Sequence, residues 1–195
     1  MADRILCAPA TGARRGELLG LQWPDLQGNQ LMIGHSLSQV GQGVFLKEPK
    51  NKKFRTITIP PSALKKLQAH RKKQQPYREH FGDSYQGDFI FCNPDGSPLK
   101  PDTVSASVSL LFRNLDLPKG ASLHTLRHTH GSQLLAAGVP LTDVSKRLGH
   151  SSPHVTATIY AHSLPGHDDL AAAAWEKFQK HGKPKIKPAR ARKTA

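Results

Sequence analysis

Short apolar stripes at helical spacing constrain the fold of this chain more than any other feature of its sequence. Between residues 102 and 115, apolar side chains recur every three or four positions: Val104, Val108, Leu111, Phe112 and Leu115. This is the pattern of a helix with one buried face. Comparable segments predict helices over 14–22, 124–135, 142–148 and 153–162, and a last helix from Asp168. Gly138 and Gly149 follow two of these segments, where glycine commonly ends a helix.

The front part of the chain carries strand signals instead. Residues 30–37, 43–48 and 55–59 are short apolar runs separated by polar turns, and residues 88–92 form one more. A basic helix should begin at Pro61 and end near Pro76. The 195 residues suffice for one domain with its own core. The predicted fold class is therefore α+β, mainly α-helical, with a small antiparallel β-sheet near the N-terminus.

The chain is strongly basic, and its charge is not confined to one end. It has 28 Lys and Arg residues against 14 Asp and Glu, a formal net charge of +14. Residues 180–195 hold seven of the basic residues and no acid, which leaves 21 basic against 14 acidic residues elsewhere. We expect a polyanionic partner, nucleic acid first, because each neutralised phosphate releases counterions.

Cysteine usage and hydropathy predict a cytoplasmic protein without a membrane partner. Cys7 and Cys92 form neither a disulfide framework nor a CxxC pair, so a reducing compartment is expected. No apolar run approaches membrane-spanning length, and the N-terminus lacks the apolar region of a signal peptide.

One segment, HTLRHTHGSQLL at residues 124–135, combines an arginine and three histidines with an apolar stripe. His124 and Arg127 are three residues apart and share a helix face. The apolar residues nearby are predicted to face a core, namely Leu126, Leu134 and Ala137. Three interpretations are open for this segment: a polar helix face with hydrogen-bonded histidines, a metal site, or a site for an anion.

Two enzyme classes fit the sequence poorly. The metalloprotease pattern H-E-x-x-H requires a glutamate after the first histidine, but Thr125 follows His124. His150 and His154 repeat the spacing, again without the acidic residue. A serine hydrolase of the G-x-S-x-G type is also excluded, because that motif is absent. We predict neither a metal site nor a cofactor.

The order of the charged segments is more informative than any one of them. ATGARRGELLGL, PKNKKFRTITIP, HTLRH, LGHSS and TIYAH follow one another from Ala10 to His162, with a tyrosine ten residues after the histidine of LGH. This series resembles the tyrosine recombinases, the phage integrase family. The resemblance implies a tyrosine-recombinase-like catalytic domain that cleaves and rejoins DNA at specific sites through a covalent 3′-phosphotyrosine, without a metal.

The resemblance also implies a role for each matching residue. Six residues would be catalytic: Arg14, Lys50, His124, Arg127, His150 and Tyr160. Tyr160 would be the nucleophile, and Glu17 would support Arg14 from one helical turn away. Four further residues would contact DNA phosphates or lie on the solvated surface: Arg15, Lys52, Lys53 and His128.

These residue types suit phosphoryl transfer on chemical grounds. Two guanidinium groups from distant segments, Arg14 and Arg127, could hold the oxygens of a phosphodiester in bidentate fashion. A deprotonated phenol forms covalent intermediates, histidines exchange protons near neutral pH, and a hairpin lysine could protonate the leaving 5′-hydroxyl. Two hypotheses result: a recombinase catalytic domain, or a DNA-binding remnant of an integrase that does not cleave.

The resemblance sets expectations for organisation as well. Residues 1–165 would form the catalytic domain without its N-terminal start, 166–181 a C-terminal helix, and 182–195 a disordered basic tail. The chain would be part of a longer bacterial protein associated with the nucleoid. That parent would bind double-stranded DNA as a homotetramer, with the C-terminal helix docked on a neighbouring protomer, whereas this chain alone would be a monomer.

Overall fold

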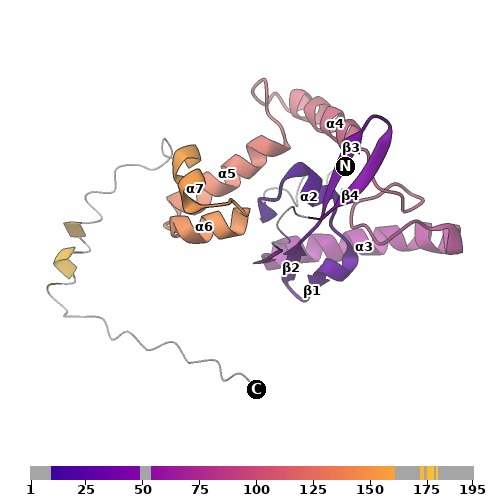
Figure 1. Ribbon diagram of the computed structural model, residues 1–195. Helices are drawn as coiled ribbons and strands as arrows, with labels where there is room; N and C mark the ends of the chain where they lie inside the picture. Colours follow the sequence, from indigo (N-terminus) through magenta and orange to yellow (C-terminus); the bar gives the residue numbers. More distant parts are fainter. Residues whose placement is uncertain (1–9, 49–53, 161–171, 174, 178, 180–195) are drawn as a thin grey trace, which may run out of the picture.

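The computed structural model describes residues 10–48, 54–160, 172–173, 175–177 and 179. The helices are α2 (Arg15–Leu19), α3 (Pro61–Phe81), α4 (Pro101–Asn114), α5 (Leu123–Ala136), α6 (Leu141–Leu148) and α7 (Pro153–Tyr160). The strands are β1 (Leu26–Gln27), β2 (Gln30–Ile33), β3 (Ser36–Val40), β4 (Gly43–Lys47) and β5 (Arg55–Thr58), with short 3-10 turns η1 (Trp23–Asp25) and η2 (Gly82–Ser84). Figure 1 shows α5, α6 and α7 gathered in one group and the strands with α3 and α4 in another. The predicted fold class is confirmed.

The strands form two antiparallel units. β2 is the central strand of a sheet with the order β1-β2-β5, in which Leu31 pairs with Ile57, and β3 and β4 form a separate hairpin. Residues 30–37, predicted as one strand, are divided at Gly34, where the chain leaves the sheet for the hairpin. A Cβ on Gly34 would lie 2.3 Å from the Phe54 ring, so glycine is needed for this close approach.

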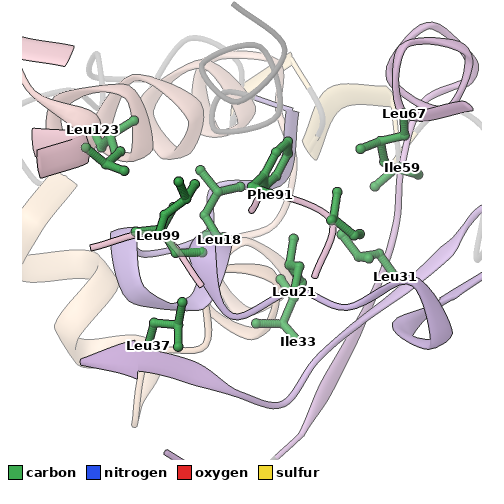
Figure 2. Close-up of a cluster of buried hydrophobic side chains, with 14 of the residues drawn as sticks. Leu18, Leu21, Leu31, Ile33, Leu37, Ile59, Leu67, Phe91, Leu99 and Leu123 are labelled. Carbon is green, nitrogen blue, oxygen red and sulfur yellow. The ribbon is translucent and has the colours of Figure 1, made fainter. Parts of the chain in front are cut away.

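The main hydrophobic core lies where α2, the three-stranded sheet, α3 and α4 meet. Figure 2 shows part of this core, with Leu18 of α2, Leu31 and Ile33 of β2 and Leu67 of α3 around Phe91. A smaller core joins α5, α6 and α7, and its buried members are Leu135, Val144, Leu148 and Tyr160. Burying each such side chain contributes roughly 1.5–3 kcal/mol. The two cores hold the elements that carry the charged segments in fixed positions.

Helix α3 continues to Phe81 instead of ending near Pro76 as predicted. Pro76 costs the helix one backbone hydrogen bond, but the flanking turns are held by tertiary contacts. Gln74 of α3 is buried, and Arg78 of the same helix forms an ion pair with Asp88. These contacts outweigh the proline, which lies at an exposed position of the helix.

Residues 88–92 do not form the predicted strand: Phe89 and Cys92 make isolated bridges, and the chain bends between them. The Gln74 side-chain amide donates to the Ile90 carbonyl at 2.9 Å, and His70 Nε2 lies 2.7 Å from the same oxygen. Side chains of α3 therefore satisfy a backbone group that a neighbouring strand would otherwise pair.

Some predictions concern residues outside the described ranges, namely Lys50 as a catalytic residue, Lys52 and Lys53 as DNA contacts, the helix start at Asp168 and the tail 182–195. Residues 172–173, 175–177 and 179 are helical, as predicted for this part of the chain. The division into catalytic domain, C-terminal helix and tail stays a prediction. None of the helices in the described part of the chain is both long and apolar enough to cross a membrane.

Candidate active site

Three arginines from distant parts of the chain converge on the C-terminal end of α6. The carbonyls of residues 147, 148 and 149 each accept a hydrogen bond from a different arginine. The donors, in that order, are Arg55 Nε at 2.9 Å, Arg127 Nη2 at 2.7 Å and Arg14 Nη2 at 3.2 Å. The last carbonyls of a helix lack intrahelical partners and carry the negative end of its dipole, so they favour cations. Gly149 ends α6 as predicted, in the left-handed conformation with φ 69°.

Arg127 lies on the inward face of α5 and is only 3% exposed. Besides its bond to α6, its Nη1 donates to the Gly12 carbonyl at 2.6 Å. Backbone carbonyls thus compensate for the removal of the guanidinium from water. Burial first, and then the charge of Arg14, lowers the pKa of Arg127 to about 10. Arg127 remains protonated at neutral pH.

The inward face of α5 differs from the predicted one. Its buried residues are Leu123, Arg127, His130, Gly131 and Leu135. The prediction was wrong for Ala137, which is exposed, while Leu126 and Leu134 are partly buried. His124 is exposed one turn before Arg127. The sequence pattern failed here because an arginine, which usually faces solvent, occupies the middle of the buried face.

Glu17 lies between two arginines. Its carboxylate accepts hydrogen bonds from Arg55 at 3.0 and 2.7 Å and from the Arg14 side chain at 2.8 Å. Burial alone would raise the pKa of Glu17, but the hydrogen bonds and charge of Arg55, and then of Arg14, lower the pKa to about 2. Glu17 is therefore ionised at any physiological pH and links α2 to β5.

His150 directly follows the end of α6. Its Nδ1 lies 2.7 Å from the Thr156 hydroxyl oxygen, which orients the ring against α7. Burial first, and then the charges of Arg127, Arg14 and Arg55, lowers the pKa of His150 to about 4. The imidazole is thus neutral at pH 7, where it can accept a proton on one ring nitrogen and donate from the other.

Tyr160, the last residue of α7, is 2% exposed and belongs to the smaller core. A Cβ on Gly131 would lie 2.3 Å from its hydroxyl oxygen, so the phenol lies directly against α5. The Tyr160 ring centroid is 5.8 Å from that of His128, which in turn is 4.4 Å from that of His124. Burial raises the pKa of Tyr160, and the charge of Arg127 opposes this only in part. The phenol is protonated in this conformation.

A pocket of about 920 Å³ opens beside these groups. Four charged side chains line it, Arg14, Glu17, Arg55 and Lys146, together with the imidazoles of His35 and His150. Apolar side chains of Ile33, Phe54 and Val155 complete the wall. In the described residues, no three His, Cys, Asp or Glu side chains are placed together as metal ligands. The pocket can receive an anionic group that also has an apolar part.

The structure brings together most of the residues singled out by sequence: Arg14, Glu17, Arg127 and His150 at the end of α6, and His124, His128 and Tyr160 beside them. Arg15 is not among them, because its Nη1 donates to the Ser105 hydroxyl on α4 at 2.7 Å. Arg55 was given no role from the sequence. Strand alternation could have identified it, because it shares a face with the buried Ile57.

Residues 4–167 match the sequence model of the phage integrase family. The chain belongs to the phage integrase family. The match contains every segment on which the resemblance was based, from ATGARRGELLGL to TIYAH.

Known members of the family are similar to this chain in sequence. The chain is 31% identical over 180 residues to a XerC-like tyrosine recombinase of Caldanaerobacter subterraneus subsp. tengcongensis, a match covering 83% of this chain and 45% of that protein. It spans about half the length of the curated relatives it matches.

Among solved structures, the Tn1549 transposon integrase in complex with a circular intermediate DNA gives a TM-score of 0.75 at 26% identity, over 90% of this chain and 57% of that chain. The catalytic domain of bacteriophage HP1 integrase shares the fold, with a TM-score of 0.60 at 22% identity over 93% and 84% of the two chains.

Proposed function

We propose that this chain is the catalytic part of a site-specific DNA recombinase, which cleaves and rejoins double-stranded DNA through a covalent 3′-phosphotyrosine. The observation that carries the proposal is the convergence of Arg14, Arg127 and His150 at the end of α6, beside the helix that ends with Tyr160. Membership of the phage integrase family supports it. The DNA complex of the Tn1549 integrase supports DNA as the substrate class.

Arg14 and Arg127 would bind the scissile phosphate in different ways. The Arg14 side chain is 48% exposed at the pocket and keeps donors for a phosphate oxygen. Arg127 is fixed by two carbonyls and contributes a positive charge that does not reorganise during the reaction. Preorganised charge of this kind is commonly the largest contribution to catalysis. His124, exposed on α5, would add a hydrogen bond to the same phosphate.

The chemical step needs one nucleophile and two proton transfers. The Tyr160 oxygen would attack phosphorus, the bond to the 5′ oxygen would break, and that oxygen would take a proton to become a free 5′-hydroxyl. Burial, and then the charges of His124 and Arg127, lowers the pKa of His128, so its neutral ring can accept the phenol proton. Lys50 would supply the proton to the leaving oxygen. Rejoining would follow the same steps in reverse.

Tyr160 cannot react from its position in this structure, because its hydroxyl is packed against Gly131. Cleavage therefore requires α7 to shift so that the phenol reaches a phosphate bound at Arg14. The burial of Tyr160 is the observation that favours the second function, a DNA-binding remnant that does not cleave.

The test uses a nicked duplex that traps a covalent adduct after strand cleavage, in the presence of a metal chelator. We expect a protein–DNA adduct on a denaturing gel that disappears in Tyr160→Phe. Retention of DNA without any adduct would favour the remnant, and an adduct that requires added divalent metal would contradict the mechanism.

We also propose that the protein acts on DNA as a homotetramer and that the C-terminal helix contacts a neighbouring protomer. Trp175 is 61% exposed on this helical segment, so its ring can contribute apolar surface to such a contact. Sedimentation on DNA should show tetramers that no longer form in Trp175→Asp. Tetramers unaffected by this change would rule out the contact.

A further inference from the structure

Arg55 and Arg14 share the two oxygens of Glu17 evenly. Oε1 accepts from Arg14 Nη1 at 2.8 Å and from Arg55 Nη1 at 3.0 Å. Oε2 accepts from the Arg14 backbone N–H at 2.8 Å and from Arg55 Nη2 at 2.7 Å. The carboxylate therefore has one hydrogen bond from each arginine on each oxygen, and its orientation is fixed.

The two arginines differ in what remains available to a ligand. The Arg55 side chain is 15% exposed, and its guanidinium donates to both Glu17 oxygens and to the Arg147 carbonyl. The Arg14 side chain is 48% exposed. Arg14 is thus placed to touch a substrate, whereas the donors of Arg55 are directed toward the protein.

We propose that Arg55 is a positioning residue for the cleavage reaction: it fixes Glu17, and Glu17 in turn holds Arg14 in its binding orientation at the pocket. The proposal rests on the function proposed above. It assigns a role in the site to Arg55, the first residue of β5, which follows Lys50 in the sequence by five residues.

Arg55 also controls the charge at the pocket. Glu17 with Arg14 alone would be a neutral ion pair, and a neutral pair attracts a phosphate weakly. With Arg55 the three side chains carry a net positive charge, while each oxygen of Glu17 keeps two donors. Arg55 therefore allows Arg14 to be held by a carboxylate without losing its attraction for an anion.

Gly149 leaves the space that Arg55 occupies. A Cβ on Gly149 would lie 2.7 Å from Arg55 Nη1, and its φ of 69° already favours glycine. The glycine of LGH thus ends α6 and allows Arg55 to lie against the end of that helix.

The first experiment titrates the Glu17 carboxyl by NMR in the full chain, with selective labelling, and needs no DNA. Glu17 is faced by Arg14 of its own segment, Arg55 of β5 and, less directly, Arg127 of α5. In Arg55→Gln we expect its pKa to rise above that in wild type, and by more than in Arg14→Gln. An equal or smaller rise in Arg55→Gln would overturn the proposal.

The second experiment compares single-turnover cleavage of the nicked duplex with DNA affinity. We expect Arg55→Gln to slow cleavage by about 10–100-fold, the loss that is typical when a partner that orients a ligating side chain is removed from a metal site, with affinity changed less. Arg55→Lys keeps the charge but lacks the planar guanidinium that donates to both Glu17 oxygens, and it should recover part of the rate. In the double variant with Glu17→Gln the loss should not exceed that of the worse single change, because both act through one contact.

The control is Arg78→Gln, which removes an arginine from an ion pair on α3, outside the pocket. Its cleavage rate should equal that of wild type. If Arg55→Gln and Arg78→Gln cleave alike while wild type is active, Arg55 is only a structural residue.

If wild type forms no adduct, the proposed function fails, and the Glu17 titration still decides whether Arg55 fixes the carboxylate. If Arg55→Gln does not fold, the same comparisons are made with Arg55→Lys, in which an unchanged Glu17 titration and rate would overturn the proposal.

Discussion

Arg127→Ala should weaken the fold as well as the chemistry, because Arg127 connects α5 to two other segments. Its guanidinium donates to the Gly12 carbonyl at 2.6 Å and to the Leu148 carbonyl at 2.7 Å, and it is 3% exposed. Alanine would leave both carbonyls without these donors and open a cavity. Each hydrogen bond from a charged donor contributes about 1.5–3 kcal/mol.

The two bonds together contribute roughly 3–6 kcal/mol, and returning the guanidinium to water offsets part of this. We therefore expect Arg127→Ala to lower the free energy of unfolding by about 3 kcal/mol. Arg14→Ala should cost under about 1 kcal/mol, since its side chain is half exposed and Glu17 keeps Arg55. Arg127→Lys should lie between them.

Urea unfolding followed by fluorescence provides the assay, because Trp23 is 7% exposed in the main core. Trp175→Phe should be the common background so that Trp23 alone is observed. With a slope of about 2 kcal/mol per molar urea, a loss of 3 kcal/mol moves the midpoint by about 1.5 M. A midpoint within about 0.25 M of the background protein would refute the argument that Arg127 bridges these segments in solution.

Three further results are expected. The free energy of unfolding should fall as the pH drops from about 6.5 toward 4, because the folded pKa of His150 is lowered to about 4 and the unfolded chain takes up the proton first. In urea titrations His150→Asn should flatten this fall, and a profile unchanged in the variant would contradict the prediction. Gly131→Ala should lower the melting temperature by several degrees, because its Cβ would lie 2.3 Å from the Tyr160 hydroxyl; an unchanged melting temperature would show that the phenol lies elsewhere. Deleting residues 180–195, with their seven basic residues, should make DNA affinity depend less steeply on salt concentration. The slope of log affinity against log salt should flatten by about 0.9 for each DNA phosphate that the tail neutralises, and a slope equal to that of the full chain would show that the tail does not contact the DNA.

The helices were predictable from the sequence where apolar spacing and a stop signal agreed. α6 ends at Leu148 before Gly149, as expected for a glycine in the left-handed conformation. α3 was predicted too short, because a local signal at Pro76 was opposed by tertiary contacts of Gln74 and Arg78 that no local pattern contains.

The candidate site was predictable as a set of residues, but not in its arrangement. The order of motifs singled out Arg14, Arg127 and His150, and they lie together at the end of α6. Hydrophobic spacing placed Arg127 on the polar face of its helix, away from the core, because a local pattern does not include the carbonyls of two other segments that accept from the guanidinium. The burial of Tyr160 was likewise hidden, since it depends on the small size of Gly131 on a different helix.

Mapping the covalent adduct tests the central claim most directly, because the chain contains three tyrosines. Tyr77 is 49% exposed on α3, and Tyr85 forms a hydrogen-bonding contact with Cys92, so both serve as internal controls. After trapping on a nicked duplex, digestion and mass spectrometry should locate the 3′-phosphate on Tyr160 alone. The adduct should persist in Tyr77→Phe and Tyr85→Phe and vanish in Tyr160→Phe. A phosphate on Tyr77 or Tyr85, or an adduct that survives Tyr160→Phe, would contradict the account.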